Sequence, residues 1–386
     1  MQLVAYGAQD IYLTGNPQIT FFKVVYRRHT NFSMEAIEQT WSGSDTTTGR
    51  CTATISRNGD LVHRMYLEIF GTTRATVNNP MSAIITDVEL EIGGQKIDKH
   101  SGLWMEVWTE LTEKNSTGGC ADGGSTLFQK MSGMGGFCGQ SAINPARFFV
   151  PLQFWFNRNP GLALPLIALQ YHEVKVILNH NISTATYGLN TTVPKENKLW
   201  CDYIYLDTDE RRRFAQVSHE YLIEQVQEQS ITTGTGSKDL NFNHPVKELI
   251  WTNSTQGTLE AADATLGAVG TTNGDTYQIK LNGHDRFAAR DYRYFTRTQV
   301  WEHHSGAGGL NAEGGATAQF NDSIAVYSFA LKPEEHQPSG TCNFSRIDNA
   351  QLAVAGGSGA DALTIFAVNY NVLRIMSGMG GLAYSN

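Results

Sequence analysis

Short runs of alternating apolar and polar residues recur along the whole chain, and each of them fits a β-strand better than a helix. Clear examples lie at residues 65–69, 174–178, 277–281 and 363–367. Successive side chains of a strand point to opposite faces, so this alternation predicts strands with one buried face and one polar face. Each run is bounded by Gly, Asn, Asp, Thr or Pro, which favour turns. We therefore predict a chain built from short antiparallel strands.

Two of these runs end in dipeptides that favour tight hairpins. In Thr86–Lys96 the alternating residues are followed by Gly93-Gly94, and the run at 277–281 is followed by Asn282-Gly283. Gly and Asn tolerate the positive φ angles that a two-residue hairpin turn requires. We therefore predict a hairpin at each of the two dipeptides.

Helical patterns are scarce. The best one is Ser101–Lys114, where Leu103, Val107 and Leu111 recur every four residues and predict one amphipathic helix, expected to pack on a sheet edge. Strands and helices do not alternate, which disfavours a parallel sheet. The predicted fold class is all-β, with two antiparallel sandwiches or jelly rolls. The boundary between them is expected near Asp207–Gln229, where a strand-like segment ends and a new apolar stretch begins.

Several long segments rich in Gly, Thr, Ser and Asn interrupt the strand pattern. We expect them to be loops at the ends of the sandwiches, and loops of this length are usually functional or determine shape. They are Asn115–Gly124, Gly234–Lys238, Thr252–Asp275 and His304–Ala318.

The charge content excludes some classes of protein. Charged residues make up 17% of the chain and the net charge is −8, whereas ordinary soluble domains have about 25% charged residues. Neither half is basic enough to suggest nucleic-acid binding. Much of the surface must therefore be uncharged and polar, or be covered by contacts.

Membrane insertion and disulfide scaffolds are also disfavoured. The segment from Met1 has no basic and apolar leader, and the longest apolar run, Leu162–Leu169, is far shorter than the roughly 20 residues of a membrane helix. The five cysteines are widely spaced and contain no Cys-x-x-Cys pair, so reduced thiols are expected. Cys138 and Cys342 have no nearby histidine and are predicted to be buried structural residues.

No pattern for catalysis, a cofactor or a metal stands out. His172-Glu173 and His219-Glu220 lack the second histidine of a zinc peptidase helix, and His303-His304 would point to opposite faces of a strand. We therefore predict no catalytic, cofactor-binding or metal-binding residues, and no enzyme.

One acidic cluster has two interpretations. One interpretation takes Asp207, Asp209 and Glu210 as glycosidase carboxylates, but these need two carboxyl groups facing one cleft. The favoured interpretation is a charged strand end that pairs with the basic run Arg211–Arg213.

Seven Asn-x-Ser/Thr sequences occur in the chain. Several are expected by chance in a composition this rich in Asn and Thr. The only predicted glycan carriers are those placed in loops: Asn115, Asn190 and Asn253.

Longer blocks of sequence carry a resemblance to a known family. The segments Gly7–Lys23 and Tyr26–Phe32 closely resemble the opening of major capsid proteins of nucleocytoplasmic large DNA viruses, particularly those of algal and giant viruses. The resemblance continues through further blocks that span nearly the whole chain: Glu91–Asp98, Phe154–Val174, Asp202–Thr208, Glu210–Phe214, Leu281–Phe287, Tyr327–Pro333, Gln337–Asp348 and Asn369–Arg374.

The resemblance implies a double jelly roll, which is two eight-stranded antiparallel sandwiches with a few short helices in loops. It also implies an N-terminal arm at 1–24, a first jelly roll at 25–213 and a second at 214–386. Three copies would form a pseudo-hexagonal capsomer of an icosahedral shell, in contact with minor capsid proteins and close to an internal viral membrane. The protein would be located in the virion capsid and made in the host cytoplasm.

Two other functions stay open at the level of sequence. One alternative is a minor or paralogous capsid component of the same type of virus. The other is a glycan-binding β-sandwich, because the chain is rich in aromatic residues and has long loops.

Overall fold

The computed structural model describes most of the chain. The described residues are 32–71, 79–114, 126–135, 137, 146–183, 195–231, 234–253, 269, 275–306, 308, 322–356 and 362–384. The predicted arm at 1–24 lies outside them, as do the whole loop Asn115–Gly124 and most of the loops Thr252–Asp275 and His304–Ala318.

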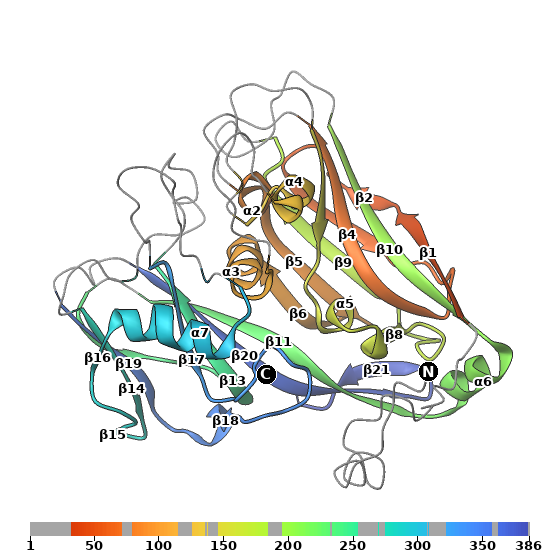
Figure 1. Ribbon diagram of the computed structural model, residues 1–386. Helices are drawn as coiled ribbons and strands as arrows, with labels where there is room; N and C mark the ends of the chain where they lie inside the picture. Colours follow the sequence, from red (N-terminus) through yellow and green to blue (C-terminus); the bar gives the residue numbers. More distant parts are fainter. Residues whose placement is uncertain are drawn as a thin grey trace, which may run out of the picture.

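The first half of the chain forms a sandwich of two antiparallel sheets (Figure 1). One sheet has the order β1 (Phe32–Gln39), β10 (Glu196–Leu206), β4 (Leu61–Gly71) and β7 (Ala146–Pro151), and β8 (Leu164–Pro165) also pairs with β4. The facing sheet has the order β2 (Trp41–Gly43), β3 (Gly49–Thr54), β9 (Val174–His180), β5 (Ile85–Ile92) and β6 (Gln95–Ser101).

The second half forms another antiparallel sandwich. Its first sheet has the order β11 (His219–Ile231), β20 (Leu363–Met376), β13 (Pro245–Thr252) and β17 (Ile324–Ser328), with β18 (Cys342–Asn343) and β21 (Met379–Leu382) at its margins. Its other sheet contains β12 (Gly236–Asp239), β19 (Ala350–Ala355), β14 (Thr276–Leu281), β15 (His284–Asp285) and β16 (Arg290–Asp291).

The two sandwiches are topologically equivalent. In the order β1-β10-β4-β7, the first strand of the sandwich pairs with its last strand, the last strand pairs with an early strand, and that early strand pairs with a later one. The order β11-β20-β13-β17 of the second sandwich follows the same rule. The order β3-β9-β5-β6 corresponds in the same way to β12-β19-β14-β15. One chain therefore contains two copies of one architecture.

The predicted strands and hairpins are confirmed. All four alternating runs lie in strands, namely β4, β9, β14 and β20. Gly93 and Gly94 connect β5 to β6 with φ angles of 58° and 83°, and Asn282 and Gly283 connect β14 to β15 with 51° and 75°. A side chain at Gly93 would also overlap the His172 ring. One predicted loop is wrong, because Gly234–Lys238 contains most of β12, which pairs with β19.

The helices are short and lie between strands. They are α2 (Pro80–Ile84), α3 (Gly102–Thr112), α4 (Leu127–Ser132), α5 (Trp155–Arg158), α6 (Thr208–Gln216) and α7 (Gln299–His303). A π-helical turn, η3 (Tyr294–Thr298), leads directly into α7, and two 3₁₀ turns are η1 (Pro160–Leu162) and η4 (Phe344–Arg346).

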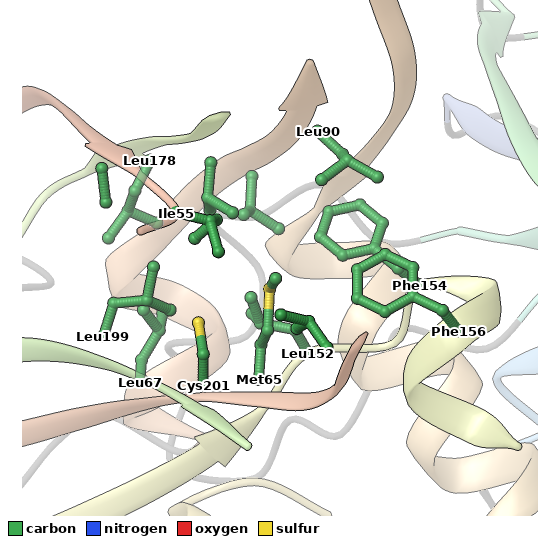
Figure 2. Packing of buried hydrophobic residues seen from close by; sticks show 14 of the residues in the cluster. Ile55, Met65, Leu67, Leu90, Leu152, Phe154, Phe156, Leu178, Leu199 and Cys201 are labelled. Carbon is green, nitrogen blue, oxygen red and sulfur yellow. The ribbon is translucent and has the colours of Figure 1, made fainter. Parts of the chain in front are cut away.

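Each sandwich has its own apolar core. Figure 2 shows part of the first, where Met65 and Leu67 of β4 and Leu199 of β10 face Leu90 of β5 and Leu178 of β9. The second core is built around Trp251, Tyr277 and Phe295. The long strands β11 and β20 extend beyond their own sandwich, so that Ile223, Leu373 and Ile375 belong to the first core. Burial of this shared apolar surface is the main force that joins the two halves.

Candidate functional site at the junction of the two sandwiches

Helix α3 of the first sandwich is the central element of the junction (Figure 1). It begins after Ser101, whose side chain accepts the N–H of Trp104 at 3.1 Å as an N-cap. The predicted helix is thus confirmed, but its predicted place at a sheet edge is wrong. Its apolar side chains pack on the outer face of the sheet β11-β20-β13-β17, and the rings of Trp104 and Phe366 lie 5.2 Å apart.

This packing explains why the strands of that sheet are buried on both faces. In β20, Ile365 and Ala367 point into the second core, whereas Phe366 and Val368 point toward α3. A strand covered on two sides reads as a continuous apolar run rather than as an alternating one. The alternation in β20 is therefore incomplete in the sequence.

The edges of β6 and β11 meet beside the helix. Asp98 Oδ1 accepts the backbone N–H of Lys99 at 2.9 Å and that of Val226 at 3.1 Å, and the Gln225 side chain donates to the carbonyl oxygen of Ile97. The other carboxylate oxygen of Asp98 lies 2.8 Å from His100 Nε2. One buried carboxylate thus links both sheets.

A buried ionic cluster crosses the same junction. Glu224 Oε2 of β11 lies 2.9 Å from Lys247 Nζ and 2.8 Å from Arg158 Nη1, and His336 lies 3.7 Å from the other oxygen. Burial alone would raise the pKa of Glu224, but the Lys247 ammonium, His336 and Arg158 lower it to about 2. Arg158 also stacks over the Trp108 ring at 4.2 Å. Glu224 is therefore ionised at any ordinary pH.

His304 lies in a second buried cluster. Its Nε2 is 3.0 Å from Glu248 Oε2, and its Nδ1 is 3.2 Å from Glu334 Oε1. Burial lowers the pKa of the imidazole, but the two carboxylates outweigh this and raise it to about 9. The charged imidazolium ties the end of α7 to β13 and to the loop that contains Glu334.

A third buried group is an acid that no cation among the described residues neutralises. Burial, followed by the neighbouring Glu110, raises the pKa of Glu106 in α3 to about 8, although the N–H of Gly135 donates to its Oε1 at 3.0 Å. Glu106 is therefore protonated at neutral pH and can remain in an apolar environment.

Two hollows border the junction. One, of about 880 Å³, runs between β6 and β11 and is lined largely by polar side chains. The other, of about 620 Å³, lies over the outer face of β4 and β7 next to Trp108 and Arg158. Within the described residues, no group of three or more His, Cys, Asp or Glu side chains is arranged to hold a metal ion. No helix among them is long and apolar enough to cross a membrane.

Comparison with known proteins assigns this architecture. Residues 20–207 match the family model described as the major capsid protein N-terminus, and residues 210–381 match that of the large eukaryotic DNA virus major capsid protein. Over 100% of the chain and 99% of the relative, it is 51% identical to the major capsid protein of Pyramimonas orientalis virus. The chain belongs to the major capsid proteins of large eukaryotic DNA viruses.

Further comparisons agree with this family. The chain is 43% identical to the major capsid protein of Paramecium bursaria Chlorella virus 1, over 100% of the chain and 99% of that protein. A chain in the quasi-atomic model of the PBCV-1 virus capsid superposes with a TM-score of 0.79 at 38% identity, covering 95% of this chain and 100% of that one. The Faustovirus major capsid protein, with a TM-score of 0.67 at 13% identity and 93% coverage of both chains, shares the fold. The predicted double jelly roll and structural capsid function are confirmed.

The acidic cluster has a structural role in this capsid protein. Asp207 caps α6 by accepting the N–H of Thr208 at 2.7 Å, and Asp209 and Glu210 lie in the first turn of that helix, where acidic residues are favourable. The predicted pairing with the basic run is not found: Arg211 pairs instead with Asp60, at 3.0 Å. The strand does end before Asp207, as predicted, because β10 stops at Leu206, and the acidic segment that follows is helical.

The predicted cysteine and glycan positions are only partly described. Cys342 is half-buried rather than buried, and burial raises the pKa of its thiol, while Cys138 lies outside the described residues. Asn115 and Asn190 also lie outside them, and Asn253 is half-buried directly after β13. The expected glycan sites are therefore untested.

Sequence analysis missed the ionic residues of the junction. A signal exists for one pair, because Lys247 and Glu248 interrupt the apolar strand β13 and are both fully buried. From the sequence, His304 is identifiable only as a poor metal ligand. Its carboxylate partners are far away in sequence, so no local pattern could have indicated them.

Proposed function

We propose that three copies of the chain form one capsomer, in which six sandwiches surround a three-fold axis and tile a facet of an icosahedral shell. The observation that carries this proposal is the topological equivalence of the two sandwiches within one chain. Two similar units per chain and three chains supply six similar units. A cyclic arrangement also closes the contact between unlike surfaces, which would otherwise continue as a fibre.

The experiment is a measurement of molar mass by light scattering after size exclusion. The expected value is near three times 42.6 kDa. A monomer that persists at high protein concentration would contradict the proposal. Electron microscopy of purified particles should show capsomers into which three copies of this chain fit.

We also propose the division of the chain. Residues 25–213 would form the first jelly roll and residues 214–386 the second, while residues 1–24 would be an arm that contacts neighbouring capsomers or minor capsid proteins. The division is supported because no described sheet mixes strands from the two sides of the boundary at 213. Limited proteolysis of the assembled trimer should remove the arm before it cuts either sandwich.

The role of the chain is proposed to be structural, without catalysis or a cofactor. The buried ionisable groups of the junction support this, because Lys247 is paired with Glu224 and His304 is paired with Glu248. We propose that the protein is made in the host cytoplasm and that the inner face of the shell approaches a viral membrane. We also propose that any glycans lie on Asn115, Asn190 or Asn253. Mass spectrometry of peptides from purified virions tests the glycan positions directly.

A further inference from the structure

The contact between the two sandwiches of one chain has a counterpart that the described residues leave open. Within the chain, α3 lies between β6 and β7 of the first sandwich and packs on the outer face of β11-β20-β13-β17. The segment η3–α7 occupies the equivalent position in the second sandwich, between β16 and β17. In the first sandwich, the outer face of the sheet β1-β10-β4-β7 is equivalent to the face that α3 covers in the second sandwich.

The exposed face of η3–α7 is suited to a contact of this kind. Trp301 is 83% exposed, and Thr298, one turn earlier, is exposed as well. On the opposite side of the segment, Phe295 and Val300 are buried in the cores. An exposed tryptophan on a well-anchored helix is typical of residues that dominate the binding energy of protein interfaces.

The outer face of β1-β10-β4-β7 carries a stripe of aromatic side chains. Trp200 of β10 stacks on Tyr66 of β4 at 6.5 Å, and Tyr66 meets the edge of Phe149 of β7 at 6.1 Å. Phe149 is 36% exposed, whereas Phe366 and Val368 on the equivalent face of the second sandwich are fully buried under α3. Aromatic side chains are enriched in the buried centres of interfaces.

The hollow of about 620 Å³ lies on this same face. Where α3 covers the second sandwich, the apolar cluster combines three components. These are the outer face of the sheet, Val300 of that sandwich's own helix α7, and α3 from the first sandwich. Around the hollow, two of these components are present: Tyr66 and Phe149 belong to the outer face of the sheet, and Trp108 belongs to α3, which is the first sandwich's own helix. The third component, a helix from another sandwich, is not provided by the residues of the chain that the structure describes.

We propose that neighbouring copies in the capsomer repeat the internal joint: the Trp301 face of η3–α7 packs into the hollow over Tyr66 and Phe149 of the next copy. The occupant is a second copy of this chain, because the contact continues an interface that each copy already contains. The strand β1 supports the same arrangement. Among the described strands it is the edge equivalent to β11, and its residues Phe32 and Met34 are exposed, whereas the middle of β11 is buried against the first sandwich.

The inference rests on the proposed trimer, and the test separates the two. The molar mass of the full chain is measured over a concentration series for the unchanged protein, for Trp301→Ala and for Tyr171→Ala. Tyr171 is a matched control, since it is 75% exposed and lies beside the β20–β21 turn, away from both proposed surfaces. Loss of an interface hot spot is expected to weaken each of the three contacts about 30-fold in Trp301→Ala. This variant should therefore dissociate to monomers at concentrations at which the unchanged protein and Tyr171→Ala remain trimeric.

Each outcome is decisive. If Trp301→Ala assembles like the unchanged protein, the assigned contact is wrong while the trimer stands. If the unchanged protein is itself monomeric, both proposals fail. Circular dichroism and the melting temperature of each variant check its folding, which a side chain as exposed as Trp301 is not expected to affect.

A crosslinking experiment tests the pairing of the two surfaces without removing Trp301 or the aromatic stripe. Thr298→Cys and Arg64→Cys place thiols on the helix face and at the hollow, both at exposed positions. A short bismaleimide is expected to join the two variants when they are mixed and allowed to reassemble, and to leave each variant alone at the background of the unchanged protein. Crosslinking of either variant with itself would show a contact between like surfaces and overturn the inference.

Discussion

Asp98 in the first sandwich accepts the backbone N–H of Val226 in the second at 3.1 Å, through the oxygen that also accepts the N–H of Lys99. Edge strands expose unpaired backbone groups, and these are usually paired, covered or charged. Here the Asp98 carboxylate satisfies one N–H on each of two edges from different sandwiches. The sheets therefore meet edge to edge without a continuous backbone ladder.

Replacing this carboxylate should weaken the junction. Asp98→Ala removes acceptors from two backbone N–H groups and leaves His100 without its partner, so we expect the free energy of unfolding to fall by about 3 kcal/mol. Urea denaturation followed by tryptophan fluorescence measures this change. Asp285→Ala is the matched control: its ion pair with Lys280 is largely exposed, and its loss should cost no more than about 0.5 kcal/mol. Equal effects of the two variants would contradict the bridging role of Asp98.

The ion pair of Lys247 and Glu224 should respond differently to single and double replacement. Glu224→Gln leaves the fully buried Lys247 ammonium without its carboxylate, and removal of one partner of a buried pair costs about 3–5 kcal/mol. The double variant Glu224→Gln with Lys247→Met should recover part of that loss because the buried ammonium is removed as well. Melting temperatures of both single variants and of the double variant decide the point, and strictly additive losses would show that the two groups do not act as a pair.

The strands could be predicted from sequence because their cause is local. Met65 and Leu67 alternate with polar residues, and this pattern alone determines which face is buried. Helix α6 is not predicted because none of its residues is buried and it therefore has no apolar stripe. Its capping residue Asp207 is interpreted from the sequence only as part of a strand end or as a catalytic acid. The segment η3–α7 is not predicted because both its buried side and its exposed side carry aromatic residues, so that no apolar stripe stands out in its sequence.

The junction could not be predicted in detail because its contacts join distant segments. Arg158 and Glu224 are 66 residues apart, and Lys247 and Pro333, which are also in contact, are 86 apart. A sequence shows that Lys247 and Glu248 interrupt an apolar strand, but it does not show which charges meet them. The same limit applies to α3, whose apolar stripe predicted burial without identifying the surface that buries it.

The buried imidazolium predicts loss of stability at alkaline pH. The pKa of His304 is about 9 in the folded chain, against 6.5 as its ordinary value, so its contribution is fully present below pH 6.5 and is lost as the pH rises toward 9. The shift corresponds to about 3 kcal/mol. Melting temperatures measured from pH 6 to pH 10 should fall over this range. In His304→Gln the decline attributable to this group should be absent, and an unchanged pH profile in that variant would refute the assignment.

The protonated acid in α3 predicts a decline that begins at lower pH. The folded pKa of Glu106 is about 8, above its ordinary value of 4.5, so between these values the folded chain holds a proton that the unfolded chain releases. Stability should therefore fall as the pH rises from 4.5 to 8 and change no further through this group above 8. Glu106→Gln keeps an acceptor for the N–H of Gly135 but cannot ionise. We expect this variant to match the unchanged protein near pH 5 and to melt at a higher temperature at pH 9. A lower melting temperature of Glu106→Gln at pH 9 would show that the carboxylate is stabilising and that its buried, protonated state is wrong.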